Sequence, residues 1–165
     1  MGFFVEVQCV ETGETLEFSD YSTITYHRLN DEPIRVPQGP AWCYNCARIQ
    51  MAEVFPQHIS STELNIETAR REPDSEIAFI CGGSVGIETL ALELQQLKEL
   101  LCHRTTGPKC LTCFSDRIQI IPDQGEIQLP NGNHYTMGNC GFASFSLAIE
   151  FQIDTNGDKI RRTMR

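Results

Sequence analysis

The chain has 165 residues, of which 41% are hydrophobic and 21% charged, and its 13 basic and 22 acidic residues give a formal net charge of −9. This length and composition are those of one globular domain, and they exclude a disordered tail, a collagen-like fibre and a coiled-coil rod. The charge has the wrong sign for a typical nucleic-acid binder, and no apolar run approaches the roughly 18–20 residues of a membrane helix.

The N-terminal part is predicted to be β-structure. Residues 3–10 and 15–18 flank a loop that contains Gly13, which predicts a hairpin, and residues 22–26 predict a third strand. Residues 31–40 contain three prolines and predict a loop, and residues 49–55 predict a strand after it.

The middle of the chain, residues 57–105, is predicted to be a two-helix insertion. Ser60 and Glu63 have the spacing of a capping box, which predicts a helix from there to Arg71. Residues 77–80 are apolar and predict a strand, followed by a Gly-rich turn for which the phosphate-binding motifs do not match.

The second helix is predicted over residues 84–103, with Ser84 as its N-cap. Five apolar side chains recur at helical spacing and predict a face that packs against a sheet: Ile87, Leu90, Leu94, Leu97 and Leu101. Leu92 and Leu100 lie off this stripe. If exposed, they would be candidates for a dimer or partner surface.

The C-terminal part is predicted to be β-structure again. Residues 117–121 predict a strand, and residues 126–129 and 134–136 flank an Asn-Gly turn and predict a hairpin. Residues 145–153 alternate between apolar and polar side chains and predict a half-buried strand, and residues 154–158 predict a turn.

Four of the eight cysteines form two Cys-x-x-Cys pairs, Cys43 with Cys46 and Cys110 with Cys113. Each pair is preceded by Gly-Pro, interpreted as a turn, and followed by Arg-Ile-Gln in a strand-like segment. A Cys-x-x-Cys turn directs two thiolates at one point, so two such turns predict a tetrahedral site that suits Zn²⁺ or a single iron ion.

These two pairs and their flanks resemble the knuckles of the zinc-ribbon and rubredoxin-like class. The resemblance implies one structural Zn²⁺ bound by Cys43, Cys46, Cys110 and Cys113. The 63 residues between the pairs exceed the compact motif and require an insertion. Ala47 and Phe114 stand where such knuckles often have glycine, which favours zinc over the more demanding rubredoxin iron site.

The other four cysteines, Cys9, Cys81, Cys102 and Cys140, are expected to be small buried hydrophobic residues. An alternative places Cys140 with His134 in a second metal site. No secretion signal is recognisable at the N-terminus, so disulfides are not expected and we expect a cytoplasmic protein.

We therefore expect a single α+β domain over residues 1–165. Its parts are an N-terminal β region with the first knuckle (1–56), the helical insertion (57–105), and the second knuckle with C-terminal hairpins (106–165). The antiparallel β-rich body would carry a zinc ribbon.

The expected function is that of a non-catalytic zinc-binding protein, because no catalytic motif is present. Its expected role is that of an interaction module, for example an immunity- or antitoxin-like protein, with an unknown protein partner of basic charge. A homodimer is an alternative. Seven acids against one base in residues 1–32 motivate the basic partner.

Three alternatives stay open. The first is a rubredoxin-like electron carrier. The second is a thiol redox protein, since Trp42-Cys43-Tyr44-Asn45-Cys46 resembles a thioredoxin-like W-C-x-x-C. The third is a nucleic-acid-associated ribbon that uses a basic tail, which comprises Lys159, Arg161, Arg162 and Arg165.

Overall fold

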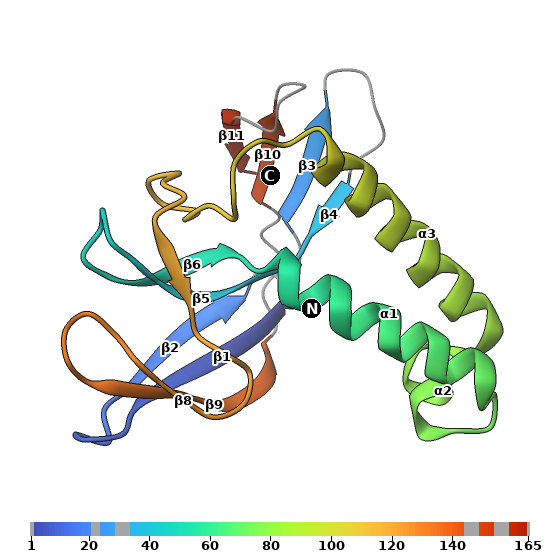
Figure 1. The fold of residues 1–165 in the computed structure, drawn as a ribbon, viewed down its shortest axis with the longest axis horizontal. Helices are drawn as coiled ribbons and strands as arrows, with labels where there is room; N and C mark the ends of the chain where they lie inside the picture. The colour runs from blue at the N-terminus through green and yellow to red at the C-terminus, as the bar shows by residue number, and fades with distance from the viewer. Residues whose placement is uncertain (1, 21–23, 29–33, 144–148, 154–158, 165) are drawn as a thin grey trace.

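The structure is a computed structural model that describes residues 2–20, 24–28, 34–143, 149–153 and 159–164. In this part of the chain, β-strands form a body of three sheets, and three helices form an arm that projects from it (Figure 1). The fold is α+β, as predicted.

The first sheet joins the N-terminal hairpin to a second hairpin late in the chain. Its strands are β1 (Gly2–Cys9), β2 (Thr15–Asp20), β8 (Glu126–Gln128) and β9 (His134–Ala143), in the order β2-β1-β9-β8 with all neighbours antiparallel. Both predicted hairpins are confirmed. Gly132 has φ 89° in the turn between β8 and β9, a conformation that glycine adopts without strain.

The second sheet, which we call the ribbon, has β5 (Gln38–Cys43) between β6 (Arg48–Glu53) and β7 (Ile118–Ile120), with both pairs antiparallel. The predicted loop over residues 31–40 is therefore wrong in its second half. Gly39 and Pro40 lie in β5 and do not form a turn before the first cysteine pair. Pro40 has no N–H to donate to a neighbouring strand. The sheet tolerates it because β7 pairs only with Ala41–Cys43 and not with Pro40.

The third sheet has the order β11-β10-β3-β4, with β3 (Ile24–Arg28), β4 (Ile34–Val36), β10 (Ile149–Ile153) and β11 (Lys159–Met164). The body is mainly antiparallel, as predicted, but one pair, β10 with β3, is parallel. The predicted strands over 22–26 and 145–153 lie partly, and the turn over 154–158 wholly, outside the described residues.

The arm contains α1 (Phe55–Arg71), α2 (Glu76–Ile80) and α3 (Gly83–Cys102). Three predictions are wrong here. The first helix begins at Phe55, so the proposed capping box lies inside it, and a proline in its first turn marks the true start. Residues 77–80 are helical, and Gly82 in the left-handed conformation, rather than Ser84, caps α3.

Helix α3 packs mainly on other parts of the arm and on β4. Ile87, Leu94 and Leu97 of the predicted stripe are buried, and so is Leu100, whereas Leu92 is 57% exposed. The stripe is therefore core as predicted, but it faces α1 and α2 as well as a strand. Of the helices in the described ranges, none combines the length and apolar character needed to cross a membrane.

Three buried clusters hold these parts together. One lies between the first sheet and the ribbon and includes Val7, Ile49 and Ile121. The second joins β4 to the base of the arm through Val36 and Leu97, and Leu111 and Phe114 of the second knuckle pack against it. The third lies entirely within the arm. The second cluster thus connects the arm directly to the cysteine-bearing end of the ribbon.

Candidate metal centre

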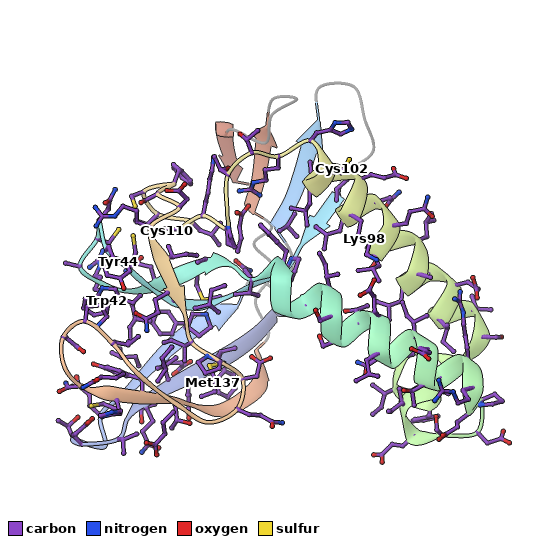
Figure 2. All side chains as sticks on the ribbon, in the orientation of Figure 1. Trp42, Tyr44, Lys98, Cys102, Cys110 and Met137 are labelled. Atoms are coloured by element: carbon purple, nitrogen blue, oxygen red, sulfur yellow. The ribbon has the colours of Figure 1, made fainter. Side chains whose placement is uncertain are left out.

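The four predicted cysteines come together at one end of the ribbon. Cys43 ends β5 and Cys46 lies in the turn to β6, while Cys110 bridges to Ala52 of β6 and Cys113 lies in the turn that follows. Their four Sγ atoms all lie within 4.8 Å of one another. Figure 2 shows Cys110 at the same end of the ribbon as Tyr44, whereas Cys102 lies near the base of the arm.

Each cysteine pair forms a knuckle in which a backbone N–H donates to the first sulfur. The Cys46 N–H donates to Cys43 Sγ over 3.5 Å, and the Thr112 N–H donates to Cys110 Sγ over 3.4 Å. The residue after each pair has positive φ, 52° at Ala47 and 62° at Phe114. Both residues therefore adopt the left-handed conformation that favours glycine, although neither is glycine.

The positive φ of Ala47 leads to a first prediction. Replacing Ala47 by glycine should stabilise the protein by about 0.5–1 kcal/mol, because the left-handed conformation strains any residue with a Cβ atom. Ala91→Gly, in helix α3, is the matched control and should destabilise by about 1 kcal/mol. Urea denaturation of the metal-loaded proteins measures both changes. A lower urea midpoint for Ala47→Gly would contradict the strain argument.

The electrostatics of the cluster call for a cation. Burial, followed by the neighbouring thiols, raises the pKa of Cys46 to about 12, and burial likewise raises the pKa of Cys110. Burial opposes ionisation of Cys43 too, but the Cys46 N–H and the other thiols outweigh it and lower the pKa of Cys43. Ionising all four cysteines therefore needs a positive ion among them.

The donor set fits a tetrahedral ion. With metal–sulfur bonds of about 2.3 Å, tetrahedral sulfurs lie about 3.8 Å apart, and Cys43 Sγ and Cys113 Sγ are 3.4 Å apart here. Cys43 and Cys110 are fully buried, Cys46 is half-buried and Cys113 is exposed. Four thiolates fill a tetrahedral shell and leave no position for a reactive water molecule.

A buried ion pair joins the segment before the second knuckle to the end of β6. The Arg104 guanidinium donates to Glu53 Oε1 over 3.0 Å and to Oε2 over 2.5 Å, and both side chains are only 2% exposed. Glu53 Oε2 also accepts the Lys109 N–H over 2.7 Å, immediately before Cys110, and Arg104 lies over the Phe55 ring at 5.2 Å. Sequence reasoning missed this pair, because its members are 51 residues apart and no local pattern links them.

Comparison with known proteins supplies no relative for this site, since no family model, curated protein or solved structure matches the chain. The interpretation of the centre therefore depends on its geometry. Cysteines 43, 46, 110 and 113 form a group that could hold a metal ion.

The remaining cysteines differ in their surroundings. Cys9 is buried, as predicted, but Cys81 is half-buried and Cys102 is exposed, so the expectation of burial is wrong for Cys102. The side chain of Cys140 lies outside the described part of the structure. His134 and Cys140 stand six residues apart along β9, about 20 Å at the usual strand rise, so one metal ion cannot bind both.

His134 instead pairs with Glu11 from the β1–β2 turn. Glu11 Oε1 lies 2.6 Å from His134 Nδ1, and the His134 backbone N–H donates to the same carboxylate. These contacts with the His134 side chain and backbone lower the pKa of Glu11 to about 2. A carboxyl whose pKa is lowered on folding stabilises the folded state above its unfolded pKa, and this contribution is lost as the pH falls through the folded value.

This contact gives a second prediction. The difference in urea midpoint between the parent protein and Glu11→Gln should be present at pH 5–7 and should shrink as the pH falls from about 4.5 to 2. Glu14→Gln, in the same turn but without a contact to His134, is the control. A difference that stays constant down to pH 2 would contradict the assignment.

Proposed function

We propose that this protein is a non-catalytic, structural zinc protein that serves as a protein-interaction module. The observation that carries the zinc proposal is the closed cluster of four cysteine sulfurs at the joined knuckles. A hydrolytic zinc ion keeps a coordination position open for water, whereas four cysteines saturate the ion and leave it a structural role. The reducing cytoplasm is the compartment that would preserve such thiols.

Two redox alternatives are less well supported by the local structure. Disulfide exchange uses a reactive cysteine at a helix N-terminus, where the helix dipole lowers its pKa. Cys43 instead ends strand β5, and Cys46 lies in a turn between two strands. A rubredoxin-like iron centre would use the same four sulfurs, so only the identity of the metal distinguishes it.

The interaction proposal is supported by the distribution of charge. Residues 54–103, which include the arm, carry eight acids and three bases, and residues 1–37 carry seven acids and two bases. The ribbon residues 38–53 and 104–121, by contrast, carry four bases and two acids. Acidic surfaces of this kind steer and select basic partners. We therefore propose a basic protein as the partner.

Elemental analysis and a visible spectrum test the metal, on protein purified without added metal and beside a Cys43→Ser/Cys110→Ser variant. The expected result is one zinc per chain, no colour, and loss of zinc in the variant. Iron with a thiolate charge-transfer band would replace the proposal by electron transfer. A protein without metal would overturn the structural-zinc proposal.

A further inference from the structure

The distal end of the arm presents its largest apolar side chains to solvent. Helix α2 and the first turn of α3 form this end, farthest from the β-sheet body (Figure 1). Phe79 is 85% exposed, Ile80 73% and Val85 78%. We call these three residues the tip. They fall within seven consecutive positions, around a turn in which Gly82 and Gly83 both have positive φ.

The core of the arm is formed without the three tip side chains. Ala78, the smallest apolar side chain of α2, is buried in the arm core with Ile66, Ala69 and Ile87. The α2 helix is anchored by its N-cap, where the Ala78 N–H donates to Ser75 Oγ over 3.2 Å. The helix therefore packs Ala78 and, in part, Ile77 against the arm core and leaves Phe79 and Ile80 in solvent. Large apolar side chains gathered in solvent are typical of an interaction site.

Three exposed acids precede the tip in the sequence. All three basic residues of the arm form ion pairs, Arg70 with Glu88, Arg71 with Glu67 and Lys98 with Glu63. In contrast, no side chain in the described ranges pairs with the exposed carboxylates of Glu72, Asp74 and Glu76, which lie directly before α2 or at its start. We call these three residues the acidic rim. It leaves three negative charges uncompensated beside the apolar tip.

We propose that the tip and the acidic rim together dock onto an apolar face bordered by Lys or Arg on a partner protein. The inference deepens the proposed interaction function and rests on it. The negative charge of the acidic rim favours a basic partner protein over a second copy of this chain or an anionic membrane. Two tips meeting symmetrically would bring the acidic rims together, and the rim would be repelled by anionic lipid headgroups.

The test uses the full-length, metal-loaded chain and a defined probe. The probe is a fluorescein-labelled 18-residue helical peptide with leucine on one face and lysine on the other, and binding is followed by anisotropy at low and moderate salt. A second peptide with the same lysines, but with serine in place of leucine, measures binding by charge alone. The parent protein should bind the leucine peptide at least ten-fold more tightly than the serine peptide.

Two variants separate the apolar and acidic contributions. Phe79→Ser/Ile80→Ser/Val85→Ser should weaken binding of the leucine peptide at least ten-fold. Glu72→Gln/Asp74→Asn/Glu76→Gln should weaken it several-fold and flatten its dependence on salt. Leu64→Ser, at a 63% exposed position of α1, and Glu14→Gln/Glu17→Gln, in the β1–β2 hairpin, are the matched controls and should bind as the parent does.

The proposal is overturned if the parent does not bind the leucine peptide, if the tip variant binds it equally well, or if both peptides bind alike. Tip-dependent dimerisation in sedimentation experiments, or tip-dependent binding to phosphatidylcholine vesicles, would overturn it in favour of a second copy or a membrane. Thermal melts should coincide for all variants, because the substituted side chains are exposed. Zinc content is unaffected by these substitutions, so failure of the tip and failure of the structural-zinc proposal are distinguishable.

Discussion

Removing the metal is expected to cause the largest loss of stability that any single treatment can produce in this protein. Structural zinc sites in small domains contribute about 10–16 kcal/mol of apparent binding free energy, and whole domains are stable by only about 5–15 kcal/mol. At the knuckle end, the two halves of the ribbon are joined by the pairing of Cys43 with Ile118, by the Tyr44 N–H to Arg117 O bond and by the Cys110–Ala52 bridge. These contacts depend on the position of the cysteines that would bind the metal. Chelation should therefore unfold the ribbon.

The single tryptophan reports this change directly. Trp42 lies in β5 next to Cys43 and packs against the cluster between the ribbon and the first sheet. Its fluorescence should shift towards that of solvent-exposed tryptophan when a strong zinc chelator is added, and the urea midpoint should fall sharply. Cys110→Ser should behave in the same way without chelator.

The control for this experiment is Cys102→Ser, which alters an exposed thiol outside the cluster. It should retain the parent's metal content, fluorescence and sensitivity to chelator. Unchanged melting of the parent protein after complete removal of the metal would contradict a folding role for the site.

Arg104→Met is expected to destabilise the protein by about 3–5 kcal/mol, the second-largest effect. The substitution leaves the Glu53 carboxylate, whose side chain is 2% exposed, buried without its guanidinium partner. It also removes the cation that lies over Phe55. Arg104→Lys should fall between the parent and Arg104→Met, because an ammonium group keeps the charge but cannot donate in the same two-pronged manner.

Two further variants make this prediction specific. Arg70→Met removes an exposed ion pair with Glu88, whose side chains are 52% and 70% exposed, and should cost at most about 1 kcal/mol. Glu53→Gln/Arg104→Met should recover part of the loss, because a neutral amide oxygen can still accept the Lys109 N–H without burying a charge. Urea denaturation with metal present measures all four variants. If Arg104→Met lies within 1 kcal/mol of the parent, the pair is not a major support of the knuckle.

The parts of the fold that were predictable from the sequence are those with a local signal. The Cys-x-x-Cys spacing predicted the cluster, Gly13 and Gly132 marked the turns of the two hairpins, and the spaced leucines marked α3. Residues 77–80 were misassigned because a run of four apolar residues has no periodicity to distinguish strand from helix. Ser75, which caps α2, was the signal that could have decided it.

Other features could not be predicted because they depend on contacts between distant residues. Pro37 and Pro40 argued for a loop, yet strands β4 and β5 form around them because β3, β6 and β7 supply partners. The Glu53–Arg104 pair depends on the arm returning to its starting point. The exposure of Phe79 could not be predicted either, because an apolar residue in a short segment is more often buried.

Folding of the arm also shortens the flexible loop that must be closed to bring the two cysteine pairs together. Helices α1 and α3 run back along one another, so Phe55 and Cys102 lie at the same, proximal end (Figure 1). Without the arm, 63 residues separate Cys46 from Cys110, but once it has formed only residues 47–54 and 103–109 remain to be ordered. Reducing an open loop from 63 to 15 residues lowers the entropic cost of closure by about 1.3 kcal/mol. A helical hairpin that forms from local contacts would thus bring the second cysteine pair back to the first during synthesis, before the metal completes the ribbon.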